Sequence, residues 1–249
     1  MSLLDLFFSL GPSVSDHGQP RHGYPVLFLD RQKLLQILYD RVQHKKRILC
    51  RSKVSSVEQL EDANGGYAIR ATTTDGVVHE GDIIVGADGI RSSIRQEMRR
   101  LAGPSQWDQE EESRVPCYYQ CNFGIAANVE GWPERRETFT MGQGQCFLTA
   151  SGPDNKCYWF LFNKLSEAEY GDGIVRYTAE DEAAMVKKFS HLKITETITF
   201  GQIYEKRLAS TLTSLHDFIF KKWYHGRMIL IGDSAHKVGK SAISLDWRM

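Results

Sequence analysis

Two short motifs combine glycine with aspartate directly after a run of apolar residues. The first is Gly86–Gly89 (Gly-Ala-Asp-Gly), and the second is Gly232–His236 (Gly-Asp-Ser-Ala-His). Glycine lets a ligand approach the backbone closely, free N–H groups at a helix start bind anions, and a carboxylate accepts hydrogen bonds from sugar hydroxyls. Both motifs are therefore candidate ligand sites, although a single motif of this kind commonly marks only a turn capped by aspartate.

A third candidate is Arg31, at the start of a predicted helix. Asp30 is placed to cap that helix, and the spacing of Leu34, Leu35 and Leu38 puts apolar side chains on one helical face. The helix dipole disfavours a cation in the first turn. Arg31 is either a solvated helix-start cation or a ligand contact, and one arginine does not separate these two interpretations.

A β-meander is expected ahead of the first motif. Residues 47–57, 67–73 and 77–85 are strand-like, and the turn signals Asn64–Gly66 and Asp75–Gly76 lie between them. The third strand leads into Gly86–Gly89, so the motif follows directly from the meander.

Each Gly-Asp motif follows a predicted strand. A helix is expected over residues 91–101, so the first motif lies where a strand leads into a helix N-terminus. The second motif follows Met228–Ile231, four consecutive apolar residues that are typical of a parallel strand with a ligand at its carboxyl end.

The section between residues 115 and 204 is mostly strand-like and rich in aromatic side chains. We predict strands at 118–129, 138–141, 146–150, 157–162 and 194–204, a helix at 180–189 and a connector at 207–223. An antiparallel sheet with one aromatic-lined face would explain the aromatic residues. Ordinary packing within a sheet explains them equally well.

The composition restricts the class of partner to small molecules or proteins. The 31 Lys and Arg residues balance the 31 Asp and Glu residues, which leaves no basic excess for nucleic acid or an anionic membrane. No stretch approaches the ~18–20 apolar residues needed to cross a bilayer. A protein without a transmembrane segment in this chain is expected.

The five cysteines predict neither a disulfide framework nor a metal site. Their odd number and apolar surroundings fit a reducing compartment. Cys117 and Cys121 lie four residues apart on a predicted strand, which separates them by roughly 13 Å. That separation is too large for two ligands of one zinc ion, so we expect no metal.

The order of these features resembles that of the FAD-dependent monooxygenases of the aromatic-hydroxylase type (group A). An arginine at a helix start, the Gly86–Ser92 motif after a meander and the Gly226–His236 motif after an antiparallel section follow one another as in that family. The segment Gly23–Arg31 is similar to the corresponding segment of the fungal branch, whose members epoxidise prenylated terpenoid precursors. The resemblance covers residues 22–238.

The resemblance implies roles for residues at matching positions. Arg31 would contact the phosphate or ribose side of FAD, Asp88 belongs to a motif that serves both FAD and NAD(P)H, and Asp233 would bind ribityl or ribose hydroxyls. The implied cofactor-binding residues are Arg31, Asp88, Gly89, Arg91, Gly232 and Asp233. Asp88 and Asp233 equally suit helix caps. No catalytic residue is implied, and His236 is expected to pack or cap, because the flavin supplies the oxidising power.

These features predict an α/β (α+β) fold with two domains. An incomplete FAD-binding, Rossmann-like domain with a β-meander would comprise residues 1–110 and 210–249, and a substrate domain with a mixed or antiparallel sheet would comprise residues 111–209.

Two features depart from the family pattern. No Gly-x-Gly-x-x-Gly turn precedes Arg31, and the second motif is followed by no proline and by Gly239 alone, where a glycine-rich turn is expected. We therefore expect a chain truncated at both ends, which binds FAD weakly or not at all by itself.

The inherited reaction would be hydroxylation or epoxidation of an apolar, terpenoid-like secondary metabolite with FAD, NAD(P)H and O2, in the cytoplasm. Two alternatives stand beside it: a non-catalytic remnant or binding protein derived from this fold, and an unrelated α+β binding protein with chance motifs. The sequence does not identify the substrate, choose NADH or NADPH, or determine the oligomeric state or the membrane association of a longer form.

Overall fold

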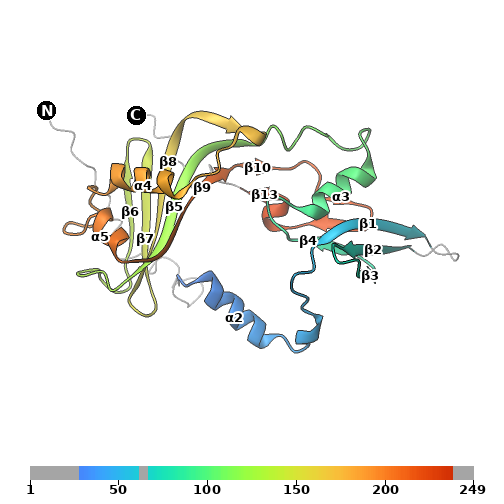
Figure 1. Cartoon of the computed structure of the whole chain (residues 1–249), viewed down its shortest axis with the longest axis horizontal. Helices are drawn as coiled ribbons and strands as arrows, with labels where there is room; N and C mark the ends of the chain where they lie inside the picture. Colours follow the sequence, from blue (N-terminus) through green and yellow to red (C-terminus); the bar gives the residue numbers. More distant parts are fainter. Residues whose placement is uncertain (1–27, 62–66, 238–249) are drawn as a thin grey trace, which may run out of the picture.

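Strands dominate the computed structural model, which describes residues 28–61 and 67–237 of the chain. The strands form two groups that lie at opposite ends of Figure 1. One is a large sheet with the helices α4 (Ala179–Phe189) and α5 (Phe200–Glu205). The other is a pair of small sheets around α3 (Ser93–Ala102). This mixture of sheets and helices confirms the predicted α+β class.

A three-stranded meander forms the outer part of the smaller group. Its strands are β1 (Val54–Glu61), β2 (Tyr67–Thr73) and β3 (Val78–Gly81), and each neighbouring pair is antiparallel. The predicted meander is thus confirmed, although the first strand begins at Val54 and not at residue 47, where a 3-10 turn, η1 (Lys45–Arg47), occurs instead.

The prediction of one strand over residues 77–85 is wrong. β3 ends at Gly81, and after Asp82 the chain enters β4 (Ile84–Gly86), which belongs to a different sheet. β4 pairs in parallel with β12 (Met228–Leu230), the apolar strand that was expected to be parallel, and β11 (Tyr224–His225) extends this sheet on the other side. The run is divided because β4 pairs with β12 and not with the meander, and Gly81 and Asp82 accommodate the break between the two strands.

Helix α3 joins the two small sheets through its buried face. Met98 and Ile94 pack with Met228 and Leu230 from β12 and with Val57 from β1, all buried in one cluster. These helical positions lie four residues apart, which is the spacing of one helix face. The apolar stripe of α3 therefore fixes the meander beside the parallel pair.

The large sheet is antiparallel throughout. Its strands, in spatial order, are β6 (Glu137–Gly142), β7 (Gln145–Gly152), β8 (Lys156–Tyr170), β5 (Pro116–Ala127) and β9 (Arg207–His216). Helices α4 and α5 cover one face. There the buried Trp159 side chain contacts the Phe200 and Tyr204 rings, and its indole Nε1 donates to Asn122 Oδ1 at 2.8 Å. This hydrogen bond satisfies two polar groups inside an apolar core.

Two expectations for the end of this section are wrong. Residues 194–204 contain α5 and not a strand, because Thr199 and Gln202 form a capping box that starts the helix. Residues 207–223 contain β9 and not a connector. β9 pairs with β5 along most of its length.

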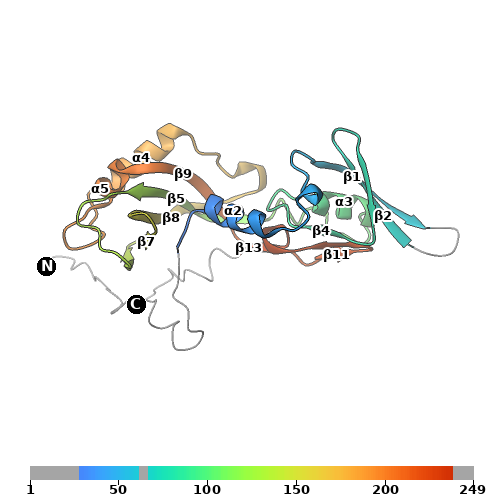
Figure 2. The same cartoon turned by 90° about the horizontal axis from the view of Figure 1, so that it is seen from below.

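Short elements complete the described chain. They are α2 (Arg31–Arg41), η2 (Gly171–Gly173), β10 (Phe218–Ile219), η3 (Gly232–Ser234) and β13 (His236–Lys237). Figures 1 and 2 show α2 on one side of the molecule, between the two groups of strands. Asp30 precedes α2 as predicted, but its carboxylate does not cap the helix. It instead binds Lys156 and accepts from the Tyr158 hydroxyl at 3.0 Å, and the Lys156 hydrogen bond lowers the pKa of Asp30.

We predict that Gly124→Ala destabilises the large sheet by about 2–3 kcal/mol, because overpacking a rigid core forces backbone or side-chain shifts. A Cβ at Gly124 would lie 2.2 Å from Trp159 Cζ2 and 2.5 Å from the Ala209 carbonyl oxygen. Gly81→Ala is the matched control, since a Cβ there meets nothing within 4 Å. Urea unfolding measures both, and equal midpoints for the two variants would contradict the packing described here.

Candidate functional site

The two Gly-Asp motifs meet at one edge of the parallel pair. Parallel strands deliver their carboxyl ends to the same edge of a sheet, and here Gly86 of β4 lies opposite Leu230 of β12. The Gly86 carbonyl accepts hydrogen bonds from Ile231 N at 3.0 Å and from Ser234 Oγ at 2.6 Å. The structure thus brings together two motifs that are more than 140 residues apart.

Asp88 caps helix α3. Its carboxylate accepts from Ser92 Oγ at 2.5 Å and from the backbone N–H groups of Ser93 at 2.7 Å and Ile94 at 3.2 Å. Ser92 is the N-cap, and its Oγ accepts from Arg95 N at 2.9 Å. The carboxylate therefore occupies the helix N-terminus, where the dipole stabilises negative charge.

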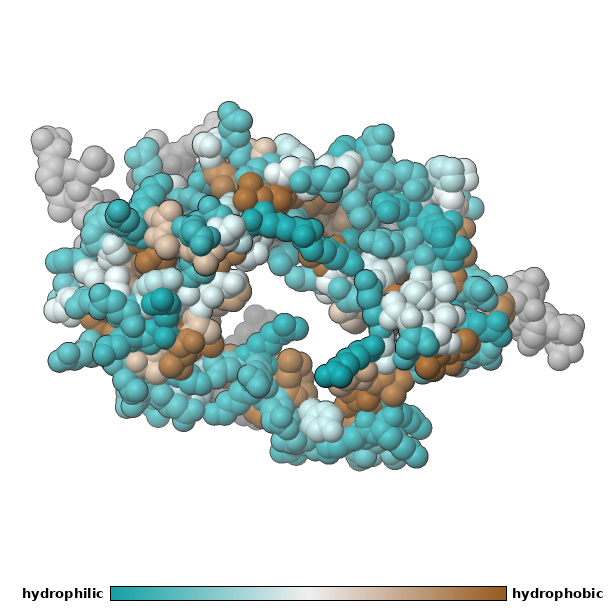
Figure 3. All heavy atoms as spheres, viewed as in Figure 1, coloured by the Kyte–Doolittle hydropathy of each residue, from teal (hydrophilic) through white to brown (hydrophobic). Residues whose placement is uncertain are grey.

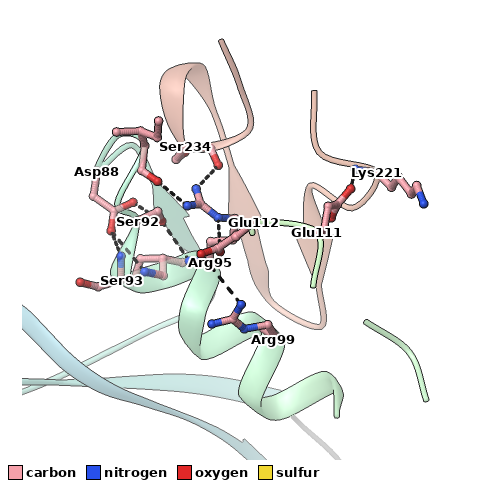
Figure 4. A network of polar contacts seen from close by, with 11 residues as sticks. Asp88, Ser92, Ser93, Arg95, Arg99, Glu111, Glu112, Lys221 and Ser234 are labelled. Carbon is pink, nitrogen blue, oxygen red and sulfur yellow. Dashed lines mark hydrogen bonds and ion pairs between the residues drawn. The ribbon is translucent and has the colours of Figure 1, made fainter. Parts of the chain in front are cut away.

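Arg95 connects the two motifs through its buried guanidinium (Figure 4). Its side chain is 3% exposed. Nη1 donates to the Ser234 carbonyl at 2.8 Å, Nη2 donates to the Ile90 carbonyl, and Nε donates to Glu112 Oε1 at 2.8 Å. The guanidinium also lies over the Phe220 ring, 4.4 Å from its centroid. One side chain thereby joins the loop after β4, the turn after β12 and the segment that follows α3.

Four of the six expected cofactor-binding residues lie on the exposed side of this edge, beside Asp88. Gly89 and Gly232 have φ of +78° and +59°, which favour glycine, and an added Cβ at either would meet nothing within 4 Å. Asp233 is exposed and forms an ion pair with Lys237 at 3.2 Å. Arg91 is also exposed. The backbone at both glycines is therefore open to a ligand.

Arg31 is not brought to this edge by any contact among the described residues. It is exposed in the first turn of α2, and no hydrogen bond or ion pair within the described part of the chain holds it. Its two sequence-based interpretations, a solvated cation and a ligand contact, both stay open.

Cationic side chains gather beside the first motif. Ile90 packs against Phe218, and Phe218 lies opposite Lys237 in the β10–β13 pair. Burial, followed by the charges of Lys237 and Arg91, lowers the pKa of His216 at the end of β9. Like charges disfavour protonation of an imidazole, so the charges of Lys237 and Arg91 both act on the His216 ring.

Sequence reasoning missed Ser92, Arg95 and Ser234, which build the junction. A usable signal existed for Arg95. It lies next to Ile94 on the helical stripe that also contains Met98 and Ala102, so a charged residue stands at a buried position of α3. Such a residue is buried only when its charge and N–H groups find partners.

We predict that Arg95→Lys lowers the free energy of unfolding by about 2 kcal/mol, because an ammonium group cannot reproduce the planar fork that reaches two carbonyls and Glu112. Arg99→Lys is the matched control. Arg99 lies in the same helix and only 3.9 Å from Glu112, with a partly exposed side chain, so we expect a change within about 0.5 kcal/mol. Chemical denaturation measures both, and an Arg95→Lys variant as stable as the control would refute this role.

Membrane-spanning helices and metal-binding clusters are both absent from residues 28–61 and 67–237. No helix there is long and apolar enough to span a membrane. No group of three or more His, Cys, Asp or Glu side chains there is arranged to hold a metal ion.

Comparison with known proteins gives close relatives along most of the chain. No protein-family model matches the sequence. The chain is 34% identical over 235 residues to the FAD-dependent monooxygenase paxM of Penicillium paxilli, covering 93% of this chain and 48% of paxM. It is also 34% identical to the FAD-dependent monooxygenase ptmM of Penicillium ochrochloron, covering 93% of this chain and 54% of ptmM. The chain thus spans about half the length of the curated relatives it matches.

Solved structures share the fold. A Klebsiella pneumoniae HpxO variant complexed with FAD superposes with a TM-score of 0.61 at 18% identity, over 86% of this chain and 51% of that one. Salicylate hydroxylase in a substrate complex superposes with a TM-score of 0.55 at 19% identity, over 83% of this chain and 50% of that one. The predicted resemblance is confirmed: along the half of their length that it spans, this chain is similar to fungal FAD-dependent monooxygenases, and it shares the fold of the solved FAD-dependent hydroxylases.

Proposed function

We propose that this chain forms part of an FAD-dependent monooxygenase that uses NAD(P)H and O2 to hydroxylate or epoxidise an apolar, terpenoid-like small molecule. The observation that carries the proposal is the junction of the two Gly-Asp motifs, which Arg95 holds at the carboxyl edge of β4 and β12. In open α/β sheets, ligands bind outside this edge.

The residues at this edge fit the ribityl side of a flavin. Gly232 and Gly89 leave the backbone open, and the exposed Asp233 carboxylate has oxygen atoms free to accept hydrogen bonds from hydroxyl groups. Asp88 fits less directly, because helix α3 uses both of its oxygens. We therefore assign Asp233 the hydroxyl contact, and we assign Asp88 the role of holding the Gly89 turn and Arg91 in position.

The cationic group of Arg91, His216 and Lys237 suits the diphosphate of NAD(P)H. These side chains come from the loop after β4, the end of β9 and β13, and they lie beside the proposed flavin edge. Burial, and then repulsion from Lys237 and Arg91, keeps the pKa of His216 low, and a diphosphate would reduce that repulsion. Arg31, in the first turn of α2, is proposed as a phosphate or ribose contact on the far side of the flavin.

The large sheet offers an apolar surface for the substrate. On the face opposite α4 and α5, the Phe123 and Phe160 rings stack at 6.1 Å, and Phe160 and Phe162 stack at 6.3 Å with planes 11° apart. Figure 3 shows an open space bounded by α2 and by the two groups of strands. A bound flavin would supply the oxygen activation, and the sheet would orient the substrate and exclude water.

We propose two domains whose second boundary differs from the sequence-based one. Residue 210 lies inside β9, which pairs with β5 in the large sheet. The return to the flavin-binding part is therefore placed after His216. The first boundary, between residues 110 and 111, stays as expected from the sequence. We further propose a cytoplasmic location.

A non-catalytic remnant is the second candidate. One observation favours it: the Asp88 carboxylate is already committed to α3. Such a protein would keep the fold and lose the cofactor.

We predict that the purified chain binds FMN about as well as FAD, with a Kd on the order of 100 µM, and that ADP displaces neither. The reason is that the described edge contacts the ribityl side and offers no diphosphate turn. Asp233→Ala should weaken binding about fivefold or more, whereas Asp172→Ala, in the distant η2 turn, should not. Quenching of flavin fluorescence measures the flavin affinity of the unchanged chain and of both variants, with and without ADP. A yellow protein with stoichiometric FAD would disprove weak binding, and no FMN binding would favour the remnant.

We predict that ADP-ribose binds to the cationic group more tightly as the pH falls. His216 has a lowered pKa and is neutral near pH 7; a bound diphosphate favours its protonated form, so affinity should rise between about pH 8 and about pH 5.5. His216→Asn should remove this pH dependence, and Arg91→Gln should weaken binding at every pH. Calorimetric titration measures the affinities, and a pH-independent affinity in the unchanged protein would rule out the diphosphate assignment.

A further inference from the structure

Fifteen side chains form a regular grid on the face of the large sheet that α4 and α5 leave uncovered. Strand register places them in three rows of five, each running from β6 to β9. The rows are Met141, Cys146, Phe162, Cys121 and Thr213; Phe139, Leu148, Phe160, Phe123 and Thr211; and Glu137, Ala150, Tyr158, Ile125 and Ala209. Glu137 is the one carboxylate among these fifteen residues.

The alternation of β6 fixes the side to which Glu137 belongs. Thr138 bonds the buried Thr149 hydroxyl at 2.7 Å, and Thr140 Oγ1 lies 3.5 Å from the Ile194 carbonyl, on the side covered by the helices. Successive strand residues point to opposite faces. Glu137 and Phe139 therefore share the aromatic face.

Glu137 has no polar partner within the described part of the chain. It is half-buried, and burial alone raises the pKa of its carboxyl group. Its cross-strand neighbour Ala150 offers no polar side chain. Asp30, the other carboxylate that reaches this face, is already neutralised by Lys156 and bonded by Tyr158. A partly desolvated carboxylate without a partner gains from any donor that a ligand brings to it.

The spacing of the strands relates Glu137 to the aromatic rings. β6 and β8 are separated by two strand spacings, so Glu137 stands about 10 Å across the sheet from Tyr158 in its own row and about 12 Å from Phe160 in the next row. Phe123 and Met141, at 39% and 44% exposed, leave parts of this face open to solvent. A ring-containing ligand about 12 Å long can lie on Phe160 and end at Glu137.

We propose that Glu137 determines substrate specificity by accepting a hydrogen bond from an O–H or N–H group at the end of an otherwise apolar, ring-containing substrate. This inference rests on the proposed function, because it assumes that the aromatic face binds the substrate. The substrate must then carry an O–H or N–H donor, which an apolar surface alone would not require.

The test compares two probes on the same biphenyl frame, 4-phenylphenol and its methyl ether 4-methoxybiphenyl, which lacks the hydroxyl donor. We expect the whole chain to bind 4-phenylphenol about tenfold more tightly, the size of one hydrogen bond to a charged group. Glu137→Ala should remove this preference while it leaves the affinity for 4-methoxybiphenyl unchanged, and Glu137→Gln should retain part of it. Glu134→Gln, an exposed residue just before β6, is the matched control and should keep the full preference.

Equilibrium dialysis measures the affinity of each probe for the unchanged chain and for each variant. Phe160→Ala should weaken both probes equally, which locates them on the aromatic face. Equal binding of the two probes, or a preference that survives Glu137→Ala, would overturn the role of Glu137 while the apolar substrate surface stands. Failure of both probes to bind, or binding unaffected by Phe160→Ala, would overturn the substrate surface and the Glu137 proposal together. Circular dichroism of each variant shows whether it is folded.

Discussion

A buried guanidinium must find an acceptor for its N–H groups and a compensating charge, and this requirement organises the candidate site. Arg95 meets it with the carbonyls of Ser234 and Ile90, the Glu112 carboxylate and the Phe220 ring. Those groups come from segments far apart in the sequence, so satisfying Arg95 requires all of them to be in place at once. The positions of Gly89 and Gly232, and the exposure of Asp233, follow from that arrangement.

Among the described residues, only one face of the small sheet β11-β12-β4 is covered at this junction. Gly86, Met228 and Leu230 face α3, while Val85, Ile229 and Tyr224 lie next to one another across the sheet and are 54%, 41% and 72% exposed. Leu34, Leu35 and Leu38 of α2 are also exposed, although their spacing gives the helix an apolar face. Parallel strands are usually covered on both faces. The sheet edge that carries the candidate site therefore depends on α3 more than is usual for such a sheet. Arg95 and Met98 are the α3 residues that hold it.

The strands with clear signals could be predicted from the sequence, and so could the site motifs. Apolar runs bounded by Gly and Asp indicated the meander and β12, and the two Gly-Asp motifs indicated both halves of the candidate site. What failed depended on contacts distant in sequence. β9 is rich in Ser and Thr and becomes a strand because β5 offers an edge, and residues 82–83 break a strand because β4 has its partner in another sheet. Arg95 was missed because its place on the apolar stripe indicates burial but does not identify its partners, which come from distant segments of the chain.

The most direct test of this junction is hydrogen–deuterium exchange of the whole chain with and without saturating FMN, followed by mass spectrometry. If the two motifs form one flavin edge, peptides that contain residues 86–95 and 228–236 should become protected together, and the β1–β3 meander should not change. Protection of one motif without the other, or protection confined to another part of the chain, would contradict the assignment of this edge as the flavin site.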